Sequence, residues 1–385
     1  MKKILVLKQF KDLNAAIALA PDELLVETKL LSRTGDLSLA ELFLIMNQDW
    51  GETNLILNWD ILMTDKIMGT IISEVEKIPL EKFAAIRVQD LGALEWLSLV
   101  KPVCPIHLNL ETGHHNIVAI KSHLDLYPSV TRVVLSQELE SSTLQEYLKE
   151  LKVETELMVL GQTLLFYTPR HLVTPLYESS EENSLQVLAT SEESPHKGFP
   201  ILENRHGTFM FNIKDHCLID HAVELKEWGM TAIRIDFSIE EHFELIKIAM
   251  DLCESFDSER FALFKTKYPR QLSKAFYRSN KSDVLFKKLK NAHLGSIDQG
   301  VLGAVVEQRK EHYTALKLKS EIKKGDLPLK AKLLTTDGKW IEVSVKSLRN
   351  AKGEDVESLQ KDDIALVNPL RKASVKALLC KEELN

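Results

Sequence analysis

Short apolar runs alternate with amphipathic stretches along most of the chain, and this alternation predicts β-strands followed by α-helices. The apolar runs cover 4–7, 23–26, 54–57, 83–88, 105–110, 131–135, 154–160 and 231–235. The stretches with helical spacing cover 13–19, 39–46, 65–75, 91–100, 116–126 and 143–152. Strands that alternate with helices of about 10–15 residues pair in parallel. Eight of them predict a closed (β/α)8, or TIM-like, barrel of the α/β class rather than an open sheet.

Residues 161–230 interrupt this rhythm as an insertion between the seventh and eighth strands. Long insertions at one face of a barrel usually carry function. Within this one, residues 199–211 alternate between apolar and polar positions on either side of a turn at 204–207. Gly207 suits a positive φ, so we expect a hairpin here.

A capped helix and the last barrel strand follow the hairpin. Asp215 is expected to cap a helix that begins near His216, and Gly229 is expected to end it. The eighth strand then ends at Arg234 and Asp236. Polar groups at the carboxyl end of a barrel strand occupy the position where barrels of this type carry their chemistry.

The pattern changes after about residue 295, where short alternating runs are separated by turns that contain glycine. These turns lie at 324–326, 337–338 and 352–353. Such a pattern predicts a small all-β barrel. We therefore expect a barrel domain at 1–259, a basic helical connector at 260–295 and a C-terminal β-barrel domain at 296–385.

Charge is unevenly distributed along the chain, although the net charge is only −7. Residues 1–259 hold 22 Lys and Arg against 41 Asp and Glu, whereas residues 260–330 hold 17 against 6. The basic block also contains Phe276, Tyr277 and Phe286, a mixture that suits RNA phosphates and bases. The alternative is a solvated region that docks on the acidic main domain. The RNA-binding candidates are Arg270, Lys274, Arg278, Lys287 and Lys288.

The N-terminal segment has too few apolar residues for a signal sequence or a membrane span, and no later stretch reaches spanning length. We therefore expect a cytoplasmic protein without a membrane partner. The four cysteines lie far apart and form no CxxC pair, which argues against structural zinc and favours buried thiols. The adjacent His114 and His115 point apart in a helix or turn, so we predict no metal site.

Three stretches of the chain together resemble peptidase family U32, the collagenase-like family. They are VVLSQELESSTLQEY, residues 199–236, and the C-terminal pattern KKGDLPLK with NAKGEDV. FNIKDHCLI, residues 211–219, resembles the family motif F-N-S-K-D-L-C-L-I, and Ser136 and Glu138 stand where the family reads R-E-L-S. The resemblance implies oxygen-independent hydroxylation of tRNA, ribosomal RNA or a ubiquinone precursor. It also implies prephenate as the oxygen donor and an iron–sulfur cluster on four cysteines.

This chain departs from the family at those cysteines. LGQTLLFYTPRH, residues 160–171, aligns with the family stretch H-G-x-x-C-x-x-Y-S-G-R-C, but Leu164 and His171 replace the two cysteines. A third cysteine of the family falls within 172–198, which contains none, and Cys217 matches the fourth. One thiolate and one imidazole do not replace four thiolates. We therefore predict that the cluster is absent and that no other cofactor is bound, with prephenate as a candidate small-molecule ligand.

Polar residues gather at the predicted carboxyl ends of the barrel strands. They are Glu27, Asn58, Asp60, Gln89, Asp90, Asn109, Glu111, Ser136, Glu138, Arg170 and Asp236. Several carboxylates at one mouth shift each other's pKa and suit general acid–base chemistry. The alternative is that Asp90 and Ser136 cap the helices that follow. Arg170 matches the family in a stretch that has lost its cluster ligands, and a guanidinium holds a carboxylate or phosphate by two hydrogen bonds.

We therefore predict three catalytic and five substrate-binding residues. The catalytic candidates are Glu138, Asp236 and Arg170. The substrate-binding candidates are Asp90, Asn109, Ser136, Tyr167 and Arg234. The sequence contains neither HExxH nor a glycine-rich phosphate loop, and it has no local signature of a Ser-His-Asp or Cys-His nucleophile.

The leading hypothesis is a protein of RNA modification or hydroxylation, which binds tRNA or rRNA through the basic connector and the terminal barrel. Without the cluster cysteines it would be a divergent or accessory member that pairs with a cluster-bearing relative. A second hypothesis is a peptidase or other hydrolase that uses the carboxylates at the mouth. A third is a non-catalytic module that binds a small anionic metabolite. The sequence leaves open whether the chain is an enzyme.

Overall fold

The computed structural model describes the chain except for residues 113, 178–183, 191–196, 279–299, 336–338 and 382–385. The chain forms two compact units, 1–280 and 281–385, which are described separately. The expected turn at 337–338 and the RNA-binding candidates Lys287 and Lys288 lie outside the described residues. In the part of the chain that the structure describes, no helix has the length and apolar content needed to cross a membrane.

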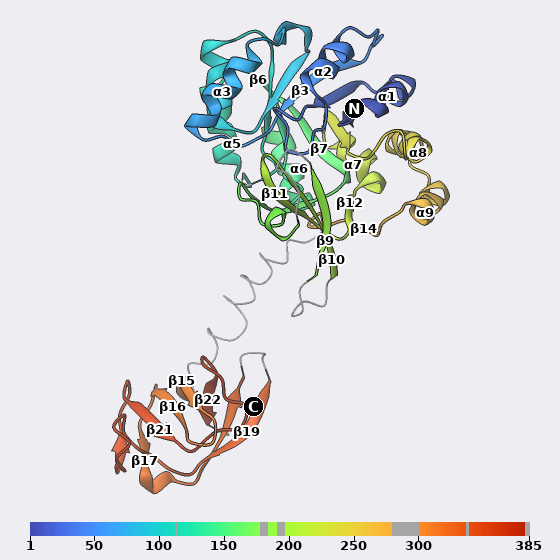
Figure 1. Cartoon of the computed structure of the whole chain (residues 1–385). Helices are drawn as coiled ribbons and strands as arrows, with labels where there is room; N and C mark the ends of the chain where they lie inside the picture. The colour runs from blue at the N-terminus through green and yellow to red at the C-terminus, as the bar shows by residue number, and fades with distance from the viewer. Residues whose placement is uncertain (113, 178–183, 191–196, 279–299, 336–338, 382–385) are drawn as a thin grey trace. The chain divides into compact units, whose positions relative to one another are not determined.

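A closed parallel barrel forms the core of the first unit, as the sequence predicts. Its strands in the described chain are β1 (Lys2–Leu7), β2 (Glu23–Glu27), β3 (Asn54–Trp59), β4 (Ala85–Val88), β5 (Ile106–Asn109), β6 (Val130–Val134), β7 (Glu154–Gly161) and β13 (Ala232–Ile235). Each strand pairs in parallel with the next, and β13 pairs with both β7 and β1, which closes the barrel (Figure 1). The strands are almost continuously buried, as expected for a barrel covered by helices.

Helices follow most of these strands and cover the outside of the barrel (Figure 1). They are α1 (Leu13–Leu19), α2 (Leu39–Met46), α3 (Asp65–Val75), α4 (Leu91–Glu95), α5 (Ile117–Leu126), α6 (Ser141–Glu150), α7 (Ala222–Glu227), α8 (Phe243–Glu254) and α9 (Ser258–Lys267). Asp90 caps α4, because its carboxylate accepts hydrogen bonds from the amides of Gly92 and Ala93 at 2.9 and 3.1 Å. The capping interpretation of Asp90 is thus confirmed.

The insertion between β7 and β13 contains an antiparallel sheet, which includes the predicted hairpin. Its strands in the described residues are β8 (Leu164–Thr168), β9 (Leu185–Thr190), β10 (Lys197–Asn204) and β11 (Gly207–Phe211), in the order β8-β11-β10-β9. Gly207 opens β11 with a φ of +120°, and a Cβ there would lie 2.1 Å from the carbonyl oxygen of Thr168. Glycine is therefore required both for the backbone conformation and for the close approach of β8.

The predicted helix cap at Asp215 is wrong. Residues Asp215–Cys217 form strand β12, which pairs antiparallel with β7 and parallel with β14 (Leu272–Ser273). The buried Asp215 carboxylate accepts a hydrogen bond from the hydroxyl of Tyr268 at 2.7 Å and pairs with Arg270 at 2.9 Å. Both side-chain donors reach Oδ2 of Asp215, so this oxygen does not cap a helix. The chain stays extended, and α7 begins only at Ala222 after a 3-10 turn.

Ser136 does not cap a helix either. Its hydroxyl accepts a hydrogen bond from the amide of Glu138 at 3.2 Å and lies 3.0 Å from Nε2 of His115. Helix α6 begins five residues later, at Ser141. The Ser136 hydroxyl is therefore hydrogen-bonded within a local turn and not at the start of the helix, where the sequence predicted it.

Part of the predicted basic connector packs with the barrel. Helix α9 and strand β14 both belong to the first unit, which extends to Asn280. Phe261 and Phe264 of α9 are buried in the same apolar core as the barrel helices. The three-part division with a boundary at 259 stays a prediction.

The second unit is all-β, as its sequence predicts. Its described strands are β15 (Val301–Arg309), β16 (Tyr313–Leu318), β17 (Ile322–Lys323), β18 (Leu329–Leu334), β19 (Trp340–Val345), β20 (Ser358–Leu359), β21 (Ile364–Val367) and β22 (Leu378–Lys381). Among the described strands, six form one antiparallel sheet in the order β19-β18-β22-β15-β16-β21, and β17 pairs with β20. Its own apolar core includes Leu302, Leu316 and Leu333.

Candidate functional site

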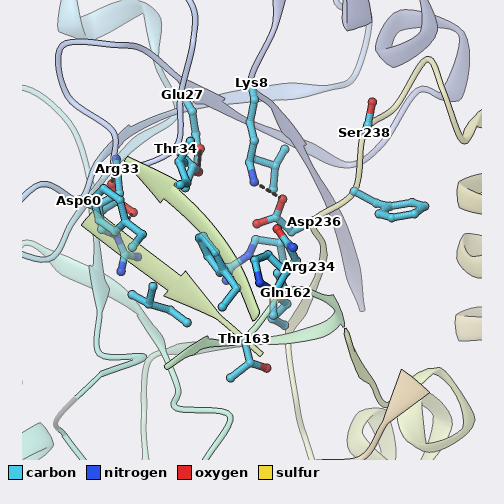
Figure 2. A pocket seen from close by; sticks show the side chains of 18 of the residues that line it. Lys8, Glu27, Arg33, Thr34, Asp60, Gln162, Thr163, Arg234, Asp236 and Ser238 are labelled. Atoms are coloured by element: carbon cyan, nitrogen blue, oxygen red, sulfur yellow. Dashed lines mark hydrogen bonds and ion pairs between the residues drawn. The ribbon is translucent and has the colours of Figure 1, made fainter. Parts of the chain in front are cut away.

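A cavity of about 1010 Å³ opens at the carboxyl ends of the barrel strands. Its floor and walls are formed by residues that follow the barrel strands, and its roof by strands β9, β10 and β11 of the insertion (Figure 2). The carboxyl ends of the strands are the active face of barrels of this type. The cavity volume also matches the upper range of small-molecule sites, about 300–1000 Å³. The cavity is therefore the candidate site.

Lys8 and Asp236 form an ion pair at the centre of the mouth. They follow β1 and β13, which pair with Leu5 opposite Ile235, so both side chains emerge side by side (Figure 2). Lys8 Nζ lies 2.5 Å from the Asp236 carboxylate. Burial acts to lower the pKa of Lys8, but Asp236 and Glu27 outweigh it and raise the pKa. For Asp236, burial is outweighed by Lys8 and Arg234, which lower its pKa, so both groups stay charged.

Glu27, at the end of β2, has the opposite tendency. Its carboxyl accepts hydrogen bonds from Asn58 Nδ2 at 2.9 Å and from the hydroxyl of Thr34 at 2.7 Å (Figure 2). Burial raises the pKa of Glu27, and the neighbouring Asp60 and Asp236 carboxylates add to the increase despite the opposing charge of Lys8. A carboxyl with a raised pKa suits a general acid or base near neutral pH.

Arg33 and Asp60 form a second pair at the mouth. Arg33 Nε and the Arg33 amide each donate to the Asp60 carboxylate at 2.8 Å (Figure 2). Burial acts to raise the pKa of Asp60, but the charge and hydrogen bonds of Arg33 outweigh it and lower the pKa. Within the described residues, Nε is the one side-chain nitrogen of Arg33 with a hydrogen bond, which leaves the terminal amino groups to face the cavity.

The floor of the cavity is a buried network of arginines and glutamates. Arg234 bonds to Glu111 and lies 3.1 Å from Glu156, which also pairs with Arg87 at 2.5 Å. Arg87 and Glu156 are almost fully buried, at 1% and 0% exposure. Buried charges of this kind are retained only when paired and hydrogen-bonded. The network therefore holds the Arg234 guanidinium in a fixed position under the cavity.

The roof is apolar. Leu164, Leu202, Phe209 and Phe211 line the cavity from the insertion sheet. Phe209 is buried and stacks on Tyr167, with ring centroids 4.8 Å apart. A cavity with a charged floor and an apolar roof suits a small molecule with polar groups at one end and a carbocyclic or aliphatic face at the other.

Comparison with known proteins identifies the family. A model of the family described as Peptidase family U32 matches residues 15–293. The chain belongs to peptidase family U32. The resemblance expected from the sequence is thus confirmed. Most residues that line the cavity lie within the matched part of this U32 chain, whereas Lys8 and its neighbours on and after β1 precede it.

Two curated relatives of this U32 chain are named tRNA hydroxylation proteins. It is 28% identical to tRNA hydroxylation protein P2 of Bacillus subtilis (strain 168) over 136 residues, which covers 32% of this chain and 44% of that protein. It is 21% identical to tRNA hydroxylation protein P of Escherichia coli (strain K12) over 327 residues, which covers 70% and 71%. The chain thus spans less than half the length of the first relative.

Among solved structures, the U32 chain is similar to the YdjI aldolase from Escherichia coli K12. The identity is 10%, the match covers 76% of this chain and 92% of that chain, and the TM-score is 0.34. A score this low carries no argument about function.

Five of the predicted site residues line the cavity of the U32 barrel: Asn109, Glu138, Arg234, Asp236 and Arg270. Asn109 is buried, and its side-chain oxygen accepts from the amide of Glu111 at 3.1 Å. Glu138 is half-exposed and lies 3.3 Å from His115 Nε2. The structure therefore brings Glu138 and Asp236 to one mouth, while their catalytic role stays a prediction.

The other catalytic and substrate-binding candidates, all among the described residues, do not line the cavity. Arg170 is exposed after β8, because residues Leu164–Thr168 form a strand of the insertion and not the end of a barrel strand. Tyr167 supports the roof, and its hydroxyl donates to the carbonyl oxygen of His206 at 3.0 Å. Asp90 and Ser136 make the local contacts described above. The placement of Arg170 at the barrel mouth is thus wrong, and its catalytic role stays untested.

Sequence reasoning missed Lys8, Arg33 and Thr34, which all line the cavity. The signal for Lys8 was present, because it directly follows the first apolar run, the same position that selected the carboxylates. Arg33 and Thr34 lie in the loop after β2, and their approach to Asp60 and Glu27 depends on the fold of that loop.

Two of the predicted RNA-binding residues are ion-paired within the first unit. Arg270 pairs with the buried Asp215, and Gln162 faces its guanidinium with the amide oxygen at 2.5 and 3.1 Å. Lys274 bonds to Asp220 and lies 2.8 Å from Nε2 of His221. Arg278 is exposed. The paired residues therefore attach this segment to the barrel.

The residues present do not fit an iron–sulfur cluster. Leu164 is a roof residue, and Nε2 of His171 lies 3.0 Å from the carbonyl oxygen of Asn204. Cys217 is buried in β12, and burial raises the pKa of its thiol to about 12. Throughout the described residues, no three His, Cys, Asp or Glu side chains are grouped so that they could hold a metal ion.

Proposed function

We propose that this U32 protein takes part in tRNA hydroxylation as a divergent member without an iron–sulfur cluster. The observation that carries the proposal is the match to two curated relatives, both named tRNA hydroxylation proteins, one of which aligns with 70% of this chain. The family match at residues 15–293 includes most of the barrel, so the proposal assigns the cavity to the small molecule that such a reaction needs. We place the activity in the cytoplasm, where tRNA is found.

We propose that the cavity binds a small carboxylate with a carbocyclic face, for which prephenate is the candidate. The terminal amino groups of Arg33 would hold a ligand carboxylate by two hydrogen bonds. Arg234 and Lys8 would supply further positive potential, and the apolar roof would cover the ring. Glu27 would give or take a proton, because burial raises its pKa toward neutrality.

Because the cluster ligands are missing, we expect this chain and a second protein to supply different parts of the reaction. Of the four cysteines in this chain, Cys217 is the one that matches a cluster cysteine of the family, so the chain would supply no redox centre of its own, and we propose that a cluster-bearing family member acts together with it. The present chain would bind the small molecule and the tRNA. Anaerobic purification followed by an iron assay is expected to yield no iron, and about four irons per chain would contradict this part of the proposal.

Mass spectrometry of tRNA nucleosides from a deletion strain tests the proposal. We expect a hydroxylated nucleoside to disappear and to return when the wild-type gene is supplied. An Arg33→Gln variant should restore less than about one tenth of it, because it lacks the charge that would hold the ligand. Lys29→Gln, which removes a cation of the exposed pair with Asp36, is the matched control and should restore it fully. Unchanged tRNA in the deletion strain would overturn the proposal.

A further inference from the structure

The all-β unit has cations without carboxylate partners. Residues 301–381 hold 17 Lys and Arg against 11 Asp and Glu. Ion pairs within the described residues include Lys317 with Asp362, Lys323 with Glu321, Lys324 with Glu357 and Arg349 with Asp355. In contrast, Arg309, Lys310, Arg371 and Lys372 are exposed and have no ion pair within the described residues. We call these four residues the hairpin patch.

The fold brings the two halves of the hairpin patch together. Arg309 and Lys310 stand at the end of the β15–β16 hairpin, and residues 370–377 run beside it. Gln308 Nε2 donates to the carbonyl oxygen of Leu370 at 2.8 Å, and the Leu370 amide donates to the hydroxyl of Thr314 at 3.0 Å. Two pairs of cations separated by 60 residues of sequence therefore lie near the turn end of one hairpin.

The hairpin patch lies beside an aromatic ring and has fewer carboxylates than cations around it. Tyr313 is half-buried and lies directly opposite Arg309 in the hairpin. The carboxylates of the hairpin are Glu307, which accepts from the Tyr313 hydroxyl at 3.1 Å, and the exposed Glu311. With these two carboxylates beside its four cations, the patch keeps a net positive charge. Exposed cations of one sign, kept apart in spite of their repulsion, create a potential that attracts a polyanion.

We propose that the hairpin patch binds the phosphate backbone of RNA. Arginine and lysine bind phosphate strongly, and a tyrosine beside them offers a surface for an unpaired base. RNA is favoured over an acidic polypeptide because the proposal rests on the proposed function, in which tRNA is the substrate. It assigns RNA binding to the second unit instead of Arg270 and Lys274, which are ion-paired with the barrel.

Binding of fluorescently labelled, unfractionated tRNA to the full chain at several salt concentrations tests this inference. The patch variant carries Arg309→Gln, Lys310→Gln, Arg371→Gln and Lys372→Gln. The matched control carries Lys317→Gln, Lys323→Gln, Lys324→Gln and Arg349→Gln, the four cations of the same unit that are already ion-paired. We expect the patch variant to bind at least about tenfold more weakly, with a salt dependence shallower by about three logarithmic units per decade. The control should bind like the wild type.

Several results would overturn the inference. They are equal weakening in both variants, no weakening in the patch variant, or no salt-dependent tRNA binding by the wild type. Displacement of tRNA by polyglutamate at equal charge would also overturn it, in favour of an acidic protein partner. If the fourfold variant does not fold, the two double variants, R309Q/K310Q and R371Q/K372Q, should each lose about half of the salt dependence. Loss of the tRNA nucleoside in the deletion strain would still support the proposed function if the patch fails.

Discussion

Glu27 and Asp236 are carboxyls at one mouth, yet their surroundings shift their pKa values in opposite directions. Asp236 has its own cation, Lys8, at 2.5 Å. Glu27 accepts hydrogen bonds from the neutral donors Asn58 and Thr34, and the negative charge of two nearby carboxylates adds to the increase in its pKa. Two acids separated in this way can divide the roles of proton carrier and fixed charge. The division follows from side chains on several strands and loops that are distant in sequence, so a motif search does not find it.

Glu27→Gln is expected to make the protein more stable at pH 8 relative to the wild type than at pH 5. The folded-state pKa of Glu27 is raised, so the folded wild type binds the proton more tightly and loses stability as the pH rises through that pKa. The amide can still accept from Asn58 and donate to Thr34. Urea unfolding at the two pH values measures the difference. Glu138→Gln at the same mouth is the control, and a difference that shrinks as the pH rises contradicts the assignment.

Glu203, in the insertion, is another carboxyl whose pKa is shifted by its surroundings. It is buried, and its carboxylate accepts from the amides of Leu172, Val173 and Thr174 at 2.7, 2.8 and 2.5 Å, and from the hydroxyls of Thr174 and Thr208. Burial acts to raise the pKa of Glu203, but these hydrogen bonds outweigh it and lower the pKa to about 2. One side chain therefore fixes the loop that follows β8.

Glu203→Gln should destabilise the first unit by about 1–3 kcal/mol at pH 7, because amide donors replace an acceptor. The folded-state pKa is depressed, so this contribution is present above the unfolded value of about 4.3 and is lost as the pH falls towards 2. Urea unfolding at pH 7 and pH 3 measures it. Hydrogen exchange at Leu172, Val173 and Thr174 should accelerate, and unchanged exchange would show that the carboxylate does not hold the loop.

At the scale of elements, the sequence pattern predicted the barrel well and the insertion in part. Each apolar run matched a strand within a few residues, because a barrel strand buried on both faces has no competing interpretation. The stretch from Asp215 failed, because its helical spacing at Ile219, Ala222 and Leu225 is also compatible with a strand followed by a shorter helix. The choice was made by Tyr268 and Arg270, more than 50 residues away in sequence.

Gly207→Ala tests the hairpin that forms the roof. A Cβ at Gly207 would meet the carbonyl oxygen of Thr168 at 2.1 Å, and φ is +120°, so β8 and β11 would have to separate. We expect a loss of more than about 2 kcal/mol of unfolding free energy and weaker ligand binding. Gly229→Ala is the control, since φ is +101° but no atom lies within 4 Å, and it should cost about 1 kcal/mol. Equal losses would mean that strain, and not contact, dominates.

At the scale of the whole molecule, the candidate cavity and the basic block occupy largely different stretches of the chain. The first unit contains the cavity. Of the residues that the sequence assigned to RNA, Arg270 and Lys274 are ion-paired with the barrel, whereas Arg278 is exposed. Composition located the excess of cations correctly, because charge counts need no fold. It could not tell which cations are free, because Asp215 and Asp220 are distant in sequence from Arg270 and Lys274.

Arg270→Gln and Lys274→Gln are expected to lower the unfolding free energy of the first unit by about 1–3 kcal/mol each and to leave tRNA affinity within about twofold of the wild type. Each removes the partner of a largely buried carboxylate. Arg278→Gln, at an exposed position nearby, should change stability by less than about 0.5 kcal/mol. Thermal unfolding and tRNA titration measure both quantities. A large loss of affinity with unchanged stability would restore these residues to an RNA interface.

The attachment of the insertion has a consequence for how the protein can evolve. The insertion leaves the barrel at Gly161 and returns at β12, where His216 pairs with Gly161 and Cys217 with Leu160. Its two ends are thus clamped on the same strand, and β13 closes the barrel on β7 independently of what lies between them. Substitutions within the insertion, including those that replace cysteines, can therefore accumulate without disturbing the closure of the barrel. A lineage can lose one chemistry and keep its scaffold by changing a single module.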